Sequence, residues 1–144
     1  MSDQPIHAAK APKPVGAYPH ARRAGNLLFL SGIGPRDPKT NAIVGNTYDA
    51  YGRLMSYDIE AQCRSVFANV RTVLEASGAR WEDLIDVTVF LTDMTHDFAE
   101  YNRVYAEYFT DAQPCRTTVG ITSLPTPIAI ELKCIAAISS PENN

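Results

Sequence analysis

The sequence predicts an α+β fold in which two helices pack on one face of a mixed sheet. Three observations predict it. Two segments repeat apolar residues at helical spacing, one segment between them alternates as a strand does, and strand-like apolar runs lie near both ends of the chain. Several runs are apolar on both sides, so the second face of the sheet must also be covered. Self-association is the simplest cover.

The first elements are expected to form a hairpin. Residues 18–23 lead into the turn signal Ala24-Gly25-Asn26, and the apolar run 27–32 reads as a strand covered on both faces. The tyrosine-rich segment 46–57 comes later. It could be a lid, although such stripes are more often interface packing.

Two helices follow from capping and periodicity. Asp58 can cap the first, whose apolar stripe runs to a stop at Ser77-Gly78. The second is expected to begin at Asp97, which resembles a capping box with Glu100, and to continue through Phe109.

Three more strands are expected. Residues 84–92 alternate, with Ile85, Val87, Val89 and Leu91 on one face. A strand at 115–122 follows Pro114, and after a proline-rich turn the last strand runs over 128–138.

Composition limits the class of protein. The 144 residues suit one domain over 1–144, with an ordered core at about 11–138 and flexible ends. A net charge of −3 with scattered basic residues gives no footprint for nucleic acid. No apolar stretch approaches a membrane span or a signal peptide, and three widely spaced cysteines do not suggest a disulfide framework. We therefore expect a soluble, cytoplasmic protein.

The motifs of several enzyme classes are missing. Zinc deaminases need His-x-Glu and Pro-Cys-x-x-Cys, but no histidine is followed by Glu two residues on, and Pro114-Cys115 continues as Arg116-Thr117-Thr118. No glycine-rich phosphate loop and no Gly-x-Ser-x-Gly elbow occurs. We expect chemistry without a metal or a cofactor.

Glu131 is the most informative residue, because it interrupts the apolar run 128–132. A carboxylate there is costly unless it is paired or used, although an edge-strand charge facing solvent fits equally well. If the last two strands form a hairpin, Arg116 and Glu131 could face one cleft. Arg116 would then clamp a substrate carboxylate, or the two residues would form a structural ion pair.

Further polar residues near the first hairpin could belong to a site. Tyr18 lies in a turn-rich entry segment, where rim packing is the more common role. Ser31-Gly32 ends a strand, so that a hydroxyl and a bare backbone could approach a ligand, or it simply ends the strand. His20 is close to Tyr18, but a lone histidine is more often merely solvated.

These residues lie within stretches that resemble the RidA/YjgF family of reactive-intermediate deaminases over residues 11–138. The matching stretches are Gly16-Ala17-Tyr18, Gly25-Asn26-Leu27-Leu28-Phe29-Leu30-Ser31-Gly32, Asp37-Pro38-Lys39-Thr40, Leu74-Glu75-Ala76-Ser77-Gly78, Val87-Thr88-Val89-Phe90-Leu91-Thr92-Asp93-Met94, Phe98-Ala99, Tyr101-Asn102, Pro114-Cys115-Arg116, Leu124-Pro125, Glu131 and Cys134-Ile135-Ala136.

The resemblance implies a chorismate-mutase-like fold that forms a homotrimer, with the sheets as an inner barrel and active sites in clefts between subunits. Trimers could pair into a hexamer. The family's carboxylate-binding arginine corresponds to Arg116, its proton-handling glutamate to Glu131, and its site tyrosine and serine to Tyr18 and Ser31. Gly32 and Thr118 are expected to contact substrate.

Within the family, the stretches 13–22 and 115–120 are most similar to 2-aminomuconate deaminase, and residues 46–57 depart from the housekeeping pattern. The resemblance therefore implies metal-free hydrolysis of 2-aminomuconate to 4-oxalocrotonate and ammonia. A general 2-iminobutyrate/2-iminopropanoate deaminase and a non-catalytic trimeric protein that senses a small acid are the alternatives.

The substrate of that reaction carries two carboxylates, so a second donor is needed far from the reacting carbon. The candidates are His20, Arg22, Arg23 and Arg36, of which His20 is favoured.

Overall fold

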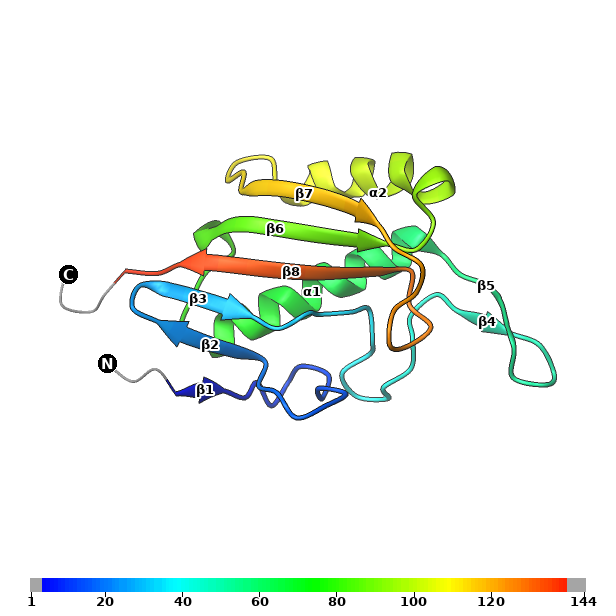
Figure 1. Ribbon diagram of the computed structural model, residues 1–144, viewed down its shortest axis with the longest axis horizontal. Coiled ribbons are helices and arrows are strands. Elements are labelled where there is room, and N and C mark those ends of the chain that lie inside the picture. The colour runs from blue at the N-terminus through cyan, green and yellow to red at the C-terminus, as the bar shows by residue number, and fades with distance from the viewer. Residues whose placement is uncertain (1–3, 140–144) are drawn as a thin grey trace.

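The computed structural model describes residues 4–139 and shows a six-stranded mixed sheet with two helices on one face (Figure 1). Only β6 and β7 are parallel, which confirms the predicted mixed α+β architecture. In spatial order the strands are β1 (Pro5–Ile6), β2 (Ala21–Ala24), β3 (Leu27–Leu30), β8 (Ile130–Ala137), β6 (Leu84–Leu91) and β7 (Cys115–Gly120).

Helix α1 (Ile59–Ala76) forms where capping and periodicity predict it. The Asp58 carboxylate accepts a hydrogen bond from the Ala61 amide at 3.1 Å, and Gly78, at φ 76°, ends the helix in the left-handed conformation. The predicted stripe faces the sheet. Its members Cys63, Val66, Phe67, Val70 and Leu74 are fully or almost fully buried.

Helix α2 (Met94–Tyr108) is capped four residues earlier than predicted. Its N-cap is Asp93, which accepts a hydrogen bond from the His96 amide at 3.1 Å. Asp97 lies one turn inside the helix, is 6% exposed, and accepts a hydrogen bond from the Tyr57 hydroxyl at 2.6 Å. The capping-box prediction was wrong because Asp93 offers an earlier cap and Asp97 faces the core.

Of the two predicted strand hairpins, one is present and the other is not. β2 and β3 pair antiparallel around Gly25, at φ 60°, as expected. β7 and β8 do not pair, because β6 lies between them. The prediction for Ile85 is also wrong. A register shift at the start of β6 turns Ile85 outward, and it is 43% exposed.

The two faces of the sheet differ in cover. Leu28, Leu30 and Leu132 point toward the helices and are at most 1% exposed. Val87, Val89 and Leu91 of β6 are likewise fully buried. On the opposite face Leu27 and Phe29 are 38% and 36% exposed, and neither helix covers it (Figure 1). An apolar second face is therefore present, as the sequence indicates.

The chain before residue 11 is better ordered than predicted. Pro5–Ile6 pairs with β2, and Ala8 is 2% exposed, so the expectation of a flexible segment before residue 11 is wrong for this part. The remaining residues expected to be flexible, 1–3 and 140–144, lie outside the described residues.

Residues 46–57 build a small hairpin that projects from the body of the protein (Figure 1). Its strands are β4 (Thr47–Tyr48) and β5 (Leu54–Ser56), all exposed, and Tyr51 at the tip is 84% exposed. A short 3-10 helix, Trp81–Asp83, precedes β6. None of the helices in residues 4–139 has both the length and the apolar character needed to cross a bilayer.

Candidate active site

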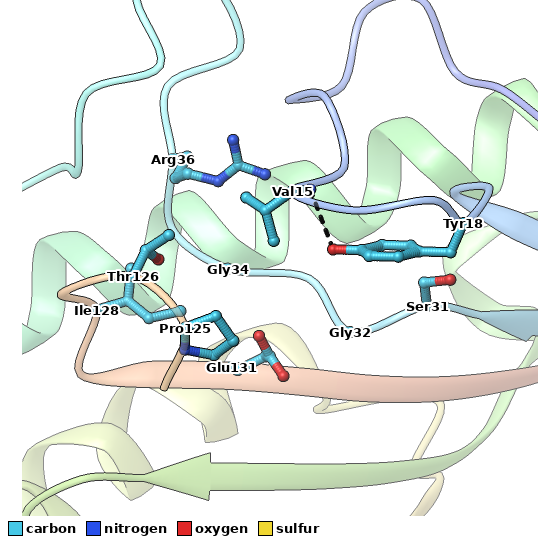
Figure 2. A pocket seen from close by; sticks show the side chains of 10 residues that line it. All are labelled: Val15, Tyr18, Ser31, Gly32, Gly34, Arg36, Pro125, Thr126, Ile128 and Glu131. Carbon is cyan, nitrogen blue, oxygen red and sulfur yellow. Dashed lines mark hydrogen bonds between the residues drawn. The ribbon is translucent and has the colours of Figure 1, made fainter. Parts of the chain in front are cut away.

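A pocket of about 360 Å³ opens where β3 ends and β8 begins (Figure 2). It brings together four of the predicted site residues: Tyr18, Ser31, Gly32 and Glu131. Arg36 lines the same pocket, and Val15, Pro125 and Ile128 give it apolar walls. Polar groups that converge in a partly apolar pocket are typical of a small-molecule site.

A bulge in the sheet shapes this pocket. Phe29 pairs with Ile135, but four residues later Ile33 pairs with Leu132 through two backbone hydrogen bonds of 2.9 Å, only three residues along β8. One extra residue therefore lies on the β3 side, and such bulges re-aim neighbouring groups. The bulge sets the backbone of Gly32 against the carboxyl of Glu131. A Cβ on Gly32 would lie 2.7 Å from its Oε2 atom.

Glu131 is half-buried and forms no hydrogen bond or ion pair with any residue from 4 to 139. It lies on a central strand, so it is not the edge charge that the sequence allowed. Burial raises the pKa of its carboxyl group, because removal of water disfavours the charged form. A carboxyl group with a raised pKa that faces a pocket can accept and return a proton.

Tyr18 and Ser31 are held by backbone contacts. The Tyr18 hydroxyl accepts a hydrogen bond from the Val15 amide at 3.2 Å, which leaves its own proton to donate into the pocket (Figure 2). The Ser31 hydroxyl donates to the Pro19 carbonyl at 2.7 Å, so it can only accept from a ligand. Ser31 thereby holds the segment that carries Tyr18.

His20 does not have the role that the sequence favoured for it. Its ring is 9% exposed, and its Nδ1 atom accepts a hydrogen bond from the Ala8 amide at 2.9 Å. Nε2 must then carry the proton, which it donates to the Pro12 carbonyl at 2.7 Å. Both nitrogens are occupied, so His20 has no donor for a substrate carboxylate and instead fastens the N-terminal segment.

Arg116 lies outside this pocket within one chain. Phe90 of β6 pairs with Glu131 of β8 on one side and with Val119 of β7 on the other, so these three side chains share one face of the sheet. Side chains alternate along a strand, and Arg116 is three residues from Val119, so the Arg116 side chain points to the opposite face. Its guanidinium lies 4.7 Å from the Tyr105 ring centre and donates to Asn102 Oδ1 at 2.8 Å. The expectation of a shared cleft within one chain is wrong, because it assumed that β7 pairs with β8.

Thr118 lies on the same face as Arg116. Its hydroxyl is hydrogen-bonded at 2.8 Å to the hydroxyl of the buried Tyr101, so it does not reach the Glu131 pocket within one chain. β7 is an edge strand. Arg116 lines a separate surface pocket of about 450 Å³ beside α2.

Arg36, which the sequence offered as a candidate second donor but did not favour, lines the pocket directly. Two further residues of the site region carry roles that the sequence did not assign. Asn69, 4% exposed on α1, donates to the Gly34 and Arg36 carbonyls, both at 2.9 Å. Gln62, fully buried on α1, accepts from the Ala129 amide at 2.8 Å, just before β8. Amides within the apolar stripe of α1 were the signal that could have found the last two.

No three His, Cys, Asp or Glu side chains gather closely enough to hold a metal ion anywhere between residues 4 and 139. The three cysteines, Cys63, Cys115 and Cys134, are all free thiols.

Comparison with known proteins gives consistent matches along the chain. The family model described as Endoribonuclease L-PSP matches residues 8–138. A RutC family protein of Pyrococcus horikoshii is 44% identical over 131 residues, which are 91% of this chain and 94% of the relative. The chloroplastic Reactive Intermediate Deaminase A of Arabidopsis thaliana is 35% identical over 92% of this chain and 65% of its own length.

Solved structures agree. The crystal structure of E. coli TdcF with bound serine superposes with a TM-score of 0.80 at 31% identity, covering 94% of this chain and 99% of TdcF. The YjgF protein of E. coli gives a TM-score of 0.78 at 32% identity, over 93% and 98% of the two chains. The chain therefore belongs to the Endoribonuclease L-PSP family, the family of the RutC and RidA/YjgF proteins, as its sequence motifs predict.

Proposed function

We propose that the protein is a hydrolytic enamine/imine deaminase whose substrate is 2-aminomuconate. The observation that carries the proposal is the unpartnered Glu131 carboxyl, which faces a pocket beside the free hydroxyl proton of Tyr18. The family contains a protein named as a reactive intermediate deaminase, which supports the reaction class. The stretches at 13–22 and 115–120 support the substrate.

The reaction needs proton transfers that these groups can perform. Water does not add to an enamine until a carbon of its conjugated chain takes up a proton, for which Tyr18 is placed as a donor. The resulting imine is electrophilic at C2. Glu131 orients a water molecule, accepts its first proton as the oxygen attacks C2, and passes that proton to the nitrogen. The C–N bond then breaks as the new hydroxyl becomes the carbonyl, ammonia leaves, and the second proton of the water restores the Tyr18 hydroxyl. The sum is 2-aminomuconate plus water giving 4-oxalocrotonate and ammonia.

Binding of the carboxylate next to C2 requires a second copy of the chain in this proposal. Arg116 is the residue for it, since a guanidinium fork matches both carboxylate oxygens. It lies at the β7 edge, away from the Glu131 pocket of its own chain. We propose a homotrimer in which Arg116 and Thr118 of one copy complete the pocket of the next. The exposed Leu27 and Phe29 face supports such an assembly.

A general imine deaminase is the rival within the same reaction class. E. coli TdcF, a relative, was solved with bound serine, which supports a small carboxylic acid as the alternative ligand. We further propose that the enzyme works in the cytoplasm, which its free thiols favour.

The decisive experiment measures ammonia release from freshly generated 2-aminomuconate and, in parallel, from 2-iminobutyrate. We expect a higher kcat/KM on 2-aminomuconate, and a fall of roughly 10²–10⁴-fold for Glu131→Gln, which keeps the shape but removes the base. Higher kcat/KM on 2-iminobutyrate would favour the general deaminase. If neither substrate releases ammonia, the remaining alternative is a non-catalytic protein that binds a small acid.

A further inference from the structure

We infer that Arg36 forms a second anion subsite at the far wall of the Glu131 pocket, which selects substrates with two carboxylates. This inference rests on the proposed function, because it names the class of substrate that the same pocket takes. Arg36 is the only cationic side chain, among residues 4–139, that lines the pocket with Glu131.

Two hydrogen bonds hold the guanidinium of Arg36 and leave other N–H donors unused. It donates one N–H to the Asn41 side-chain oxygen and another to the Lys13 carbonyl. A guanidinium has five N–H donors, so three remain for a ligand. Both of its partners are neutral oxygens, and none of the ion pairs within residues 4–139 involves Arg36, so its positive charge is not neutralised by a neighbour.

The backbone around Arg36 is built to hold this side chain at the pocket. The buried amide of Asn69 donates to the Gly34 and Arg36 carbonyls and ties this loop to α1. Asn41, the acceptor of the Arg36 guanidinium, has a left-handed backbone at φ 65°, which bends the loop back toward Arg36. A donor that is held before the ligand arrives loses little freedom on binding.

Arg36 and Glu131 occupy different walls of the pocket. Figure 2 shows Glu131 rising from β8 and the Arg36 guanidinium on the far side, next to Val15. A ligand whose reacting carbon lies at Glu131 would therefore meet Arg36 only with its distant end. An extended diacid has such a charged end, and a short monocarboxylic imine does not.

The other candidates for this role are excluded by position. Both nitrogens of His20 are used by backbone groups. Arg22 and Arg23 lie on β2 and line no part of the pocket, and Arg23 donates to the Gly25 carbonyl.

The test uses a matched pair of unreactive ligands, muconate with two carboxylates and sorbate with one on the same six-carbon diene. Calorimetric titration of the intact protein should show tighter binding of muconate. We expect Arg36→Gln to weaken muconate binding about 10–100-fold, as for loss of a charged hydrogen bond, and to leave sorbate nearly unchanged. Arg36→Lys keeps the charge without the fork and should fall between.

Arg71→Gln is the matched control, because it removes one exposed arginine charge on α1, outside the pocket. Equal binding of muconate and sorbate by the unaltered protein, an equal loss of both ligands in Arg36→Gln, or an equal effect of Arg71→Gln would each overturn the inference. An equal loss of both ligands would instead mean that Arg36 supports the loop or holds the carboxylate next to the reacting carbon.

The proposed reaction can fail separately. If muconate is preferred through Arg36 while no ammonia is released from 2-aminomuconate, the subsite stands and the reaction does not.

Discussion

A single methyl group added at Gly32 should disable Glu131 without weakening the fold. The new Cβ would lie 2.7 Å from Oε2 and 3.0 Å from Cδ of Glu131, whereas ordinary contacts begin at 3.4 Å. Gly32 does not have a positive φ, so its backbone accepts alanine. The carboxyl must move by roughly 0.7 Å, and it can do so because it is the end of a flexible side chain.

The displacement should affect activity and leave stability nearly unchanged. A misplacement of about 1 Å can cost roughly 10²-fold in rate, so we expect kcat/KM for ammonia release from Gly32→Ala to fall about 10–100-fold. The melting temperature should stay close to that of the unaltered protein. Because the methyl group acts through Glu131, the double variant with Glu131→Gln should be no slower than Glu131→Gln alone.

Gly120→Ala is the control for this experiment. It also adds a methyl group to a strand, but its Cβ would meet Met94 at an ordinary 3.6 Å. The reasoning is refuted if Gly32→Ala keeps full activity, or if its loss simply adds to that of Glu131→Gln. A large drop in melting temperature would show that the methyl group disturbs the bulge itself.

Four further predictions concern the pocket, its supports and its completion by a second copy. Because burial raises the Glu131 pKa above 4.5, the acid limb of the pH profile of kcat/KM should lie above that value and vanish in Glu131→Gln. Above its folded pKa the half-buried carboxyl is charged and lowers the stability of the folded protein. Glu131→Gln should therefore raise the melting temperature near pH 8 but not near pH 4, and the opposite pattern would contradict the buried-charge argument. Asn69→Ala leaves the Gly34 and Arg36 carbonyls without their donor and should lower the free energy of unfolding by about 1–3 kcal/mol in urea titration; an unchanged midpoint would argue against this support. The last test mixes inactive Glu131→Gln and Arg116→Ala chains, unfolded and refolded together in equal amounts. If the two residues come from different copies, about a quarter of the sites should regain activity. No recovery would mean that the two residues do not complete one site across copies.

The sequence predicts what depends on local pattern. Helix α1 was predicted from Asp58 to Gly78, because a cap, a 3.6-residue stripe and a left-handed stop act over neighbouring residues. The same holds for the β2–β3 hairpin. The importance of Glu131 was visible because a charge in an apolar strand is costly in any fold. Asp97 shows the limit, since two acidic residues four apart offered two caps and only core packing decided between them.

What tertiary structure decided is the pairing of strands and the partners of polar groups. The sequence carries no local signal that β6 enters between β7 and β8, so it could not tell that Arg116 and Glu131 lie on opposite faces of one sheet. It also could not tell His20 from Arg36, because the difference lies in which backbone groups each one meets. Both ring nitrogens of His20 are hydrogen-bonded to backbone groups, whereas Arg36 keeps unbonded N–H donors at the pocket. Residue types are local, but hydrogen-bond partners come from segments far apart in the chain, and only the folded arrangement brings them together.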